Sequence, residues 1–543
     1  MITCQKLTLS DGSDVQCKDI NVIVGSNNSG KTTFLREITT YFGQIIPNQE
    51  IHWIKSVEIK LSQIKTRVKE YIPKAYLSDF NDVNSNLDKE GLQKIYNWGE
   101  WNQSTHRYLI NNLRNKSITV DLANVEHNTD QFYGLKFLLS LFHAAELCKE
   151  RLTITTITNV PNTKQPVNDI LHYFYINPKF FDPLMKHIKK VFSLELIFDN
   201  IPVGEKALRV LTGKIPKNKP EATETYTRLW DKNTRYFGTL GDGIQAYLKI
   251  AFSIFNPVKD IIVLDEPESF LHPPQIYSLA SFIYQNSKAN KKQIFIATHS
   301  AEFIRGLLLE DKKNGSSSRL NIIYLTKNLG LEKFTAETLD VNEIRSSSQH
   351  EEQVLNSLFN NITIVCEATD DRVFYQAALN RYLPKNTHST NFISMNGLPG
   401  CLKILDFLNT LKISAACILD SDALYKDELV NFVNDKMNNS NKSSIKNCVS
   451  KMKLQFNNKQ KKYELKQKGL LAIVDNDLKI QAIEAIKLLK HIGVFILKNG
   501  SLESWANVSH MSQRKIQALI DSLSVSNNEL KYLIKEVATY GTS

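Results

Sequence analysis

The chain has 543 residues, which predicts more than one domain and leaves enough sequence for large hydrophobic cores. Its 42% hydrophobic and 23% charged residues are ordinary for a globular protein, and its net charge of +11 is compatible with a polyanionic partner such as DNA. No apolar run is long enough to cross a membrane, no secretory signal opens the chain and the seven scattered cysteines include no CxxC pair, so we expect a cytoplasmic protein without a disulfide scaffold or zinc ribbon.

The first predicted element is a buried strand at 20–24 that runs directly into a glycine-containing loop. Residues 25–32 read Gly-Ser-Asn-Asn-Ser-Gly-Lys-Thr and fit a P-loop, and the apolar spacing of 34–42 predicts a helix after it. In such a loop, backbone N–H groups surround phosphates at a helix N-terminus, the lysine reaches the outer phosphates and the threonine hydroxyl holds Mg²⁺. The residues predicted to bind ATP here are Gly25, Asn27, Asn28, Ser29, Gly30, Lys31, Thr32 and Thr33.

Residues from about 45 to 235 carry no chemical signature. The segments Leu135–Leu147 and Phe181–Phe192 have the periodicity of amphipathic helices. We interpret this stretch as a mainly helical insertion in the first domain and as a candidate dimerisation arm.

The sequence predicts two more buried strands of the nucleotide-binding domain, at 260–264 and 293–297. The first strand ends in Asp265 and Glu266, which can place one carboxylate near the magnesium and the other where an attacking water needs a base. The second strand leads to His299, thirty-three residues after Glu266. A lone histidine is usually structural, but this one follows a strand in a chain that also has a P-loop.

Residues 240–245, Leu-Gly-Asp-Gly-Ile-Gln, complete a resemblance to ABC-type ATPases. They resemble the ABC signature motif, with Gly241 and Gly243 at a helix N-terminus, and His299 resembles the switch histidine that senses the γ-phosphate. The resemblance implies that ATP is sandwiched between two heads, so the chain should at least dimerise. Asp242 stands where ABC proteins often have serine, so nucleotide sensing or slow turnover stays as open as rapid hydrolysis.

A second strand–helix alternation begins after the predicted surface turn at 311–318 and strand at 321–325. The best candidate for an interdomain linker is 345–350. The alternation predicts a parallel sheet. Its strands are expected at 362–365, 391–395, 415–419 and 494–497, and its helices at 372–380, 402–411 and 478–490. The expected domains are an ATPase head at 1–345, a second α/β domain at 355–510 and a helical tail at 511–543.

Carboxylates follow two of these strands. Glu367 comes just after one strand and Asp371 opens the next helix, while Asp420 and Asp422 end another strand. Because the carboxyl ends of parallel strands meet at one sheet edge, we expect these groups to converge there. Such crowding of like charge requires a cation, and oxygen ligands favour Mg²⁺ or Mn²⁺ over zinc.

The Glu, then Asp-x-Asp pattern resembles the Toprim domain, a Rossmann-like parallel sheet found in topoisomerases, primases and some nucleases. Residues 494–505 resemble the closing motif of OLD-family (overcoming lysogenisation defect) nucleases, which join an ABC-type ATPase head to a C-terminal Toprim domain. The likeness implies that Lys498 stabilises charge on the transition-state phosphate. It also implies that two metals are bound by Glu367, Asp371, Asp420, Asp422 and Glu503. Ala368 departs from the glycine that is common in Toprim proteins.

Residues 436–468 interrupt the second domain with ten lysines against one acid, Glu464. This insertion lengthens the spacing between Asp422 and Glu503. Two interpretations stay open: a solvated mobile loop, or an arm that contacts phosphates.

The leading functional hypothesis is an ATP-controlled, metal-dependent DNA endonuclease. One alternative is a DNA-binding ATPase of the repair or chromosome-organising type without nuclease activity. The other alternative is a topoisomerase-like enzyme, which would need a tyrosine nucleophile in a companion domain. The resemblance to OLD nucleases implies bacterial defence against phage, with the enzyme acting alone, with a helicase, or beside a retron reverse transcriptase and its DNA–RNA product.

Overall fold

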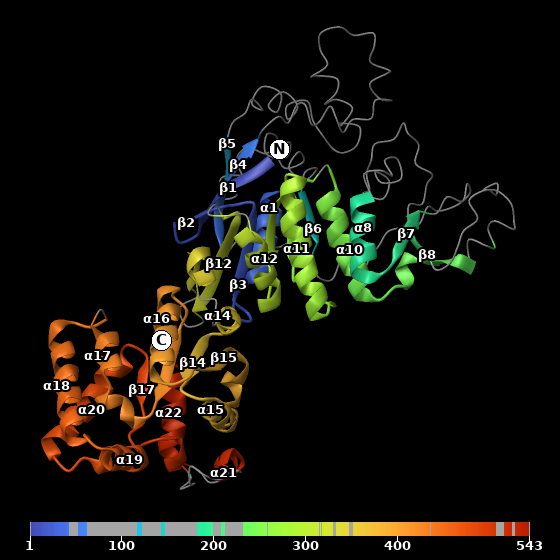
Figure 1. Cartoon of the computed structure of the whole chain (residues 1–543). Coiled ribbons are helices and arrows are strands. Elements are labelled where there is room, and N and C mark those ends of the chain that lie inside the picture. The colour runs from blue at the N-terminus through green and yellow to red at the C-terminus, as the bar shows by residue number, and fades with distance from the viewer. Residues whose placement is uncertain are drawn as a thin grey trace, which may run out of the picture. The chain divides into compact units, whose positions relative to one another are not determined.

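The chain divides into two compact units near Ser346, which are described separately below (Figure 1). The structure is a computed structural model. It describes residues 2–42, 53–61, 117–121, 143–146, 182–198, 208–211, 228, 232–257, 259–313, 315, 318–328, 333–346, 351–434, 436–505, 515–523 and 527–541. Among the helices within these ranges, none is both long enough and apolar enough to cross a membrane.

The first unit is built on a six-stranded sheet in the order β13-β12-β3-β11-β10-β6. Four neighbouring strands, β6, β10, β11 and β3, are parallel, and β12 pairs with β13 in antiparallel fashion. Every residue of β3, β10 and β11 is buried, as their continuous apolar sequences predict. The strands are β3 (Ile20–Gly25), β6 (His143–Glu146), β10 (Ile261–Asp265), β11 (Gln293–Ala297), β12 (Leu320–Asn328) and β13 (Lys333–Leu339).

Helices pack against this sheet and two smaller antiparallel sheets accompany it (Figure 1). The helices are α1 (Lys31–Tyr41), α8 (Asp182–Phe192), α10 (Asp242–Phe255), α11 (Pro273–Ala289), α12 (Ala301–Lys313) and α13 (Val341–Ser346). The first small sheet has the order β2-β1-β4-β5, from β1 (Ile2–Leu9), β2 (Asp14–Gln16), β4 (Ile54–Leu61) and β5 (Ser117–Asp121). The second contains β7 (Glu195–Phe198), β8 (Leu208–Leu211) and β9 (Thr234–Tyr236).

Few residues of the expected mainly helical insertion at 45–235 are described, so its overall helical character stays a prediction. The described residues form strands β4 to β8 and the start of β9, and α8 confirms the predicted helix at 181–192. The predicted helix at 135–147 is contradicted at 143–146, because these residues form β6 and pair with β10 in the central sheet. Residues 135–142 lie outside the described ranges.

Two segments that the sequence predicts as a surface turn and a linker begin inside helices instead. The expected turn from Asp311 begins inside α12, where the Asp311 side chain is fully buried and accepts hydrogen bonds from Tyr284 and Ser318. Arg345, expected in a linker, lies in α13 and forms an ion pair with Asp311. A buried carboxylate needs such partners, so these residues belong to the folded head.

The second unit contains a fully parallel sheet in the order β15-β14-β16-β17. The strands are β14 (Ile362–Cys366), β15 (Thr390–Ser394), β16 (Ala415–Leu419) and β17 (Val494–Ile496), close to their predicted positions. Strand β15 lies on one side of β14, and the chain then crosses to form β16 on the other side. A crevice at the carboxyl ends of the strands is expected at this switch point between β14 and β16.

The helices of the second unit cover this sheet and extend beyond it. They are α14 (Glu351–Ser357), α15 (Thr369–Tyr382), α16 (Leu398–Thr410), α17 (Asp427–Val433), α18 (Asn439–Gln455), α19 (Lys459–Lys468), α20 (Asn476–Lys490), α21 (Lys515–Ser522) and α22 (Asn528–Ala538). Short 3₁₀ helices are η5 (Pro384–Ser389), η6 (Ser421–Tyr425), η7 (Gly469–Ala472) and η8 (Leu502–Trp505). The lysine-rich insertion is therefore not a loop: it forms α18 and α19, whose N-terminal N–H groups are capped by Asn438 and Asn458.

Candidate functional site

The P-loop lies between β3 and α1 and adopts the conformation that phosphate binding needs. Asn28 and Gly30 have φ values of 66° and 91°, so the chain turns sharply just before α1 begins. A Cβ at Gly30 would lie 2.9 Å from the indole nitrogen of Trp53, so only glycine fits there. Asn27 and Asn28 are exposed on the loop, Ser29 is buried, and Thr33 is half-buried in the first turn of α1.

The two halves of the predicted nucleotide site meet at Thr32. Its hydroxyl donates to both carboxylate oxygens of Asp265, at 3.2 Å each, although 233 residues separate the two positions in the chain. A hydroxyl and a carboxylate in this arrangement are the pair that holds Mg²⁺ in P-loop ATPases. The Asp265 side chain is buried at the end of β10, where the parallel strands present their carboxyl ends.

Lys31 lies in the same site and is only 5% exposed. Its ammonium donates to the Ser29 hydroxyl at 3.5 Å. Burial lowers the pKa of Lys31 to about 8, while the charges of Glu266, Asp265 and Glu268 oppose that shift. A bound phosphate would add a further negative charge beside the ammonium and favour its protonated form.

Glu266 and His299 face each other at the ends of β10 and β11. The Glu266 backbone N–H donates to the Ala297 carbonyl at 2.8 Å, and its carboxylate lies 3.8 Å from Nε2 of His299. Burial and the nearby Lys31 lower the pKa of His299 to about 4, so the imidazole is neutral at pH 7. A neutral imidazole beside a carboxylate can accept or relay a proton, as expected for a base and a γ-phosphate sensor.

Glu268 is a part of this site that the sequence reasoning missed. Its Oε1 accepts hydrogen bonds from the His299 backbone N–H and the Thr298 hydroxyl, both at 2.8 Å. It therefore fixes the strand end that carries His299. Its other oxygen, Oε2, is buried without a hydrogen-bond partner among the described residues. The acidic run after β10 was the available signal.

The segment that resembles an ABC signature forms the start of α10. Gly241 caps the helix, and Asp242 is exposed in its first turn, where the helix dipole favours a negative charge. A Cβ at Gly243 would lie 2.3 Å from the carbonyl oxygen of Phe270, so the close approach of the segment after β10 requires glycine. These positions fit the predicted motif, and a facing second head stays a prediction.

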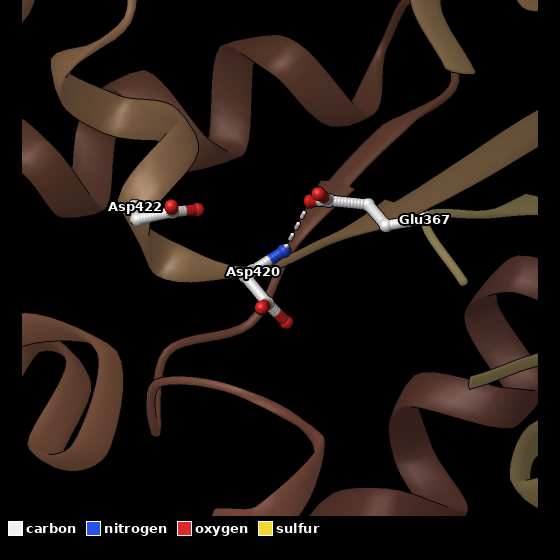
Figure 2. Close-up of side chains that lie close together, drawn as sticks. All are labelled: Glu367, Asp420 and Asp422. Carbon is white, nitrogen blue, oxygen red and sulfur yellow. Dashed lines mark hydrogen bonds between the residues drawn. The ribbon is translucent and has the colours of Figure 1, made fainter. Parts of the chain in front are cut away.

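A cluster of three carboxylates lies at the switch point of the second unit. Glu367 follows β14, and Asp420 and Asp422 follow β16. One oxygen from each lies within 4.8 Å of the other two. Figure 2 shows the carboxylates of Glu367 and Asp422 pointing toward one another, and the Asp420 backbone N–H donates to Glu367 Oε1 at 3.1 Å.

The proximity of these carboxylates perturbs their ionisation. Burial raises the pKa of Glu367 to about 7, and the charge of Asp420 raises it further. Burial also raises the pKa of Asp420 to about 6, although Lys466 lowers it and Asp422 and Glu503 add repulsion. Such a cluster is costly without a cation.

The other predicted ligands are only partly brought together with these three. Glu503 is buried, accepts a hydrogen bond from Ser501 at 2.6 Å and is close enough to raise the pKa of Asp420. Asp371 accepts a hydrogen bond from the Ala368 backbone N–H at 2.9 Å and so caps α15. The side chain of Lys498 is exposed, and its carbonyl accepts from the Leu470 N–H.

Two lysines that the sequence reasoning did not single out contact the cluster. Lys426 lies 2.9 Å from Asp422 Oδ2, and Lys466 lies 3.2 Å from Asp420 Oδ2. Lys466 comes from α19, so the lysine-rich insertion contributes directly to the carboxylate centre. Sequence spacing gave no signal for either contact.

The donor set fits a divalent cation. Three carboxylates supply hard oxygen atoms, the ligands that Mg²⁺ and Mn²⁺ prefer. Asp422 Oδ1 is buried and has no hydrogen-bond partner among the described residues. A buried carboxylate oxygen without a donor is accounted for if it coordinates an ion.

Residues 172–305 match the family described as "AAA domain, putative AbiEii toxin, Type IV TA system". This segment contains α10, β10 and β11, including Asp265, Glu266 and His299. Together with the geometry of the P-loop, the match indicates that the first unit contains an AAA-type P-loop ATPase domain, a class that binds ATP. The α/β fold class expected for the chain is thereby confirmed.

Solved structures of SMC head domains are similar to the chain. One, derived from Pyrococcus furiosus and bound to the C-terminal domain of ScpA, is 12% identical with a TM-score of 0.31, over 65% of this chain and 100% of that chain. Another, from Thermotoga maritima, is 12% identical with a TM-score of 0.29, over 62% of this chain and 98% of that one.

A relative in Methanocaldococcus jannaschii, the uncharacterized protein MJECL11, is 31% identical over 88 residues. The matched stretch covers 16% of this chain and 75% of that protein. The chain therefore belongs to the same family as MJECL11.

Proposed function

We propose that the chain is an ATP-regulated, divalent-metal-dependent DNA endonuclease of the OLD type, whose second unit is a Toprim domain. The observation that carries the proposal is the convergence of Glu367, Asp420 and Asp422 at the switch point of a parallel sheet. The position of Glu367 after β14 and of Asp420 and Asp422 after β16 supports the resemblance of the Glu, then Asp-x-Asp pattern to Toprim domains.

The residues of the centre divide by charge into two roles. Glu367, Asp420 and Asp422 would hold the cation, and Glu503 lies beside them. A cation bound there would activate water and stabilise the leaving oxygen of a phosphodiester. Lys426 and Lys466 place positive charge within 2.9 Å and 3.2 Å of these carboxylates, where a DNA phosphate would otherwise meet only negative groups.

The ATPase head would regulate this activity. Lys31, Thr32 and Asp265 would bind ATP with Mg²⁺, and the signature segment at Gly241 and Gly243 would bind the ATP of a second head in a homodimer. The proposed setting is defence against phage, alone, with a helicase, or beside a retron reverse transcriptase and its DNA–RNA product. The description of the matched family, which names a toxin, supports this setting.

Plasmid cleavage with Mg²⁺ or Mn²⁺, with and without ATP, tests the proposal. Asp420→Asn should abolish nicking and leave ATP binding intact, because the nucleotide site is made by other residues. Glu428→Gln, an exposed carboxyl in α17, is the matched control and should cleave like the wild type. Lys31→Ala should remove the effect of ATP on cleavage, whichever direction that effect has.

Two outcomes would contradict the proposal. Undiminished cleavage by Asp420→Asn would show that another centre, or a contaminant, cuts the DNA. DNA binding by the wild type without any strand breaks under either metal would instead favour the non-catalytic, repair-type ATPase.

A further inference from the structure

Helix α19 carries a high density of positive charge on side chains that do not pack in the hydrophobic core. Its ten residues contain five lysines and one glutamate, a net charge of +4, and Leu465 is its only buried residue. Of the lysines, Lys468 pairs with Glu464 and Lys466 with Asp420. Lys459, Lys461 and Lys462 are exposed, without an ion pair among the described residues.

The repulsion between these lysines is a cost that packing does not explain. Lys459 and Lys462 are three residues apart and Lys462 and Lys466 four apart, so their side chains are neighbours on one helix face. Like charges at these spacings destabilise a helix. Asp420 offsets the charge of Lys466, and Lys462 lies 5.1 Å from the centre of the Tyr425 ring. Neither Lys459 nor Lys462 has an ion pair among the described residues, so a bound polyanion would offset their mutual repulsion.

The C-terminal end of α19 is fixed against the carboxylate centre. The Ser421 hydroxyl, between Asp420 and Asp422, donates to the Leu465 carbonyl at 3.0 Å. Gly469 and Gly500 permit this contact: a Cβ at Gly469 would lie 2.1 Å from the Lys498 carbonyl, and one at Gly500 would lie 2.4 Å from the Lys466 carbonyl. The C-terminal end of the lysine face therefore lies beside the carboxylate centre.

The spacing of this face matches a phosphate backbone. At about 1.5 Å of rise per residue, Lys462 and Lys459 lie about 6 Å and 10 Å along the axis from Lys466. Phosphates of one DNA strand recur about every 3.4 Å along the duplex axis, so this length spans about three of them. Tyr463, 54% exposed on the same face, offers a ring surface beside the lysines that can pack on a sugar or base.

We propose that α19 is a DNA-binding track that holds the strand backbone on Lys459 and Lys462 and leads it past Lys466 to the carboxylate centre. This inference rests on the proposed function, because it names the element that positions the DNA for that site. Lys466 is a positioning residue in this scheme, since it contacts Asp420 as well as the end of the track.

The test is the salt dependence of DNA binding by the full chain. A labelled DNA duplex is titrated in EDTA, so that no cleavage occurs, and the affinity is measured by fluorescence anisotropy over a range of salt concentrations. The test protein carries Lys459→Gln and Lys462→Gln. The control protein loses the same charge at exposed lysines of α20 and α22, through Lys487→Gln and Lys531→Gln.

The α19 protein should show a slope of log affinity against log salt that is reduced by about two, since each phosphate contact contributes about 0.9. The control protein should keep the slope of the wild type. An unchanged slope for the α19 protein, or an equal loss in the control, overturns the proposal. Circular dichroism and unfolding temperature of both proteins show whether the helix persists.

The failure of this inference is distinguishable from the failure of the proposed function. If the wild type binds DNA through α19 but breaks no strands, the track stands and the endonuclease does not. If the wild type cleaves and the α19 protein binds with an unchanged slope, the endonuclease stands and the track does not.

Discussion

Replacing Glu367 by glutamine should stabilise the protein without metal and weaken it relative to wild type when metal is present. The rise in the pKa of Glu367 from 4.5 to about 7 corresponds to about 3 kcal/mol at alkaline pH, since each pKa unit is worth about 1.4 kcal/mol. The titrations of Glu367 and Asp420 are coupled, so the full shift does not belong to Glu367 alone. We therefore expect Glu367→Gln to raise the free energy of unfolding by about 2 kcal/mol. Glutamine keeps an oxygen that can accept from the Asp420 N–H.

The sign of this effect depends on pH in a defined window. Below pH 4.5, the Glu367 carboxyl is protonated in both folded and unfolded states, so wild type and variant should unfold alike. As the pH rises from 4.5 to about 7, the unfolded state ionises more readily, and the wild type should lose stability that the variant keeps.

Calorimetry of the full chain in EDTA measures the effect. The transition of the second unit is recognised because Mn²⁺ without nucleotide should raise it in the wild type. A gain of about 2 kcal/mol should appear as about 4–8 °C for a unit of this size. Glu484→Gln, an exposed carboxyl in α20, is the control and should not shift the transition. A variant that is less stable than wild type at pH 8 in EDTA would refute the electrostatic reasoning.

Three further predictions concern the first unit. Gly243→Ala should lower its unfolding temperature, because the new methyl group meets the Phe270 carbonyl, while Gly241→Ala, which has open space around it, should not; scanning fluorimetry compares the two. ATP affinity, measured with a fluorescent analogue, should fall as the pH rises through about 8, because Lys31 loses its proton there; a flat profile would contradict the assigned role. Asp311→Asn should destabilise the head by about 2 kcal/mol in urea, since it removes the charge that the half-buried guanidinium of Arg345 in α13 contacts; an unchanged midpoint would count against a structural role for that pair.

The elements nearest the chemistry were predictable from sequence. The predicted strands at 293–297 and 415–419 have the observed bounds, because short apolar runs of this length between polar turns favour buried strands over helices. Parallel pairing then delivers their carboxyl ends to one edge. The convergence of Glu367 with Asp420 follows from that geometry.

The segment containing β6 was not predictable in the same way. Residues 135–147 are rich in leucine and include alanine and glutamate, which favour a helix. Residues 143–146 nevertheless pair beside β10, so the hydrogen bonds offered by the edge of the sheet outweigh local preference. The sequence periodicity of one segment does not predict whether a partner strand is available to pair with it.

The contact of Lys466 with Asp420 cannot be predicted from their spacing in the sequence, because it depends on how the intervening helices pack. Forty-six residues separate the two, and the intervening helices α17 and α18 return the chain to the sheet edge. Gly469 and Gly500 then allow the end of α19 to approach the loop after β17 closely enough for the ammonium to reach the carboxylate. The insertion that lengthens the interval between Asp422 and Glu503 thus brings a cation to the carboxylate centre, and its positive charge offsets part of the repulsion there. The proposed metal centre therefore includes α19, since removing the insertion would leave the carboxylates without one of their two lysine partners.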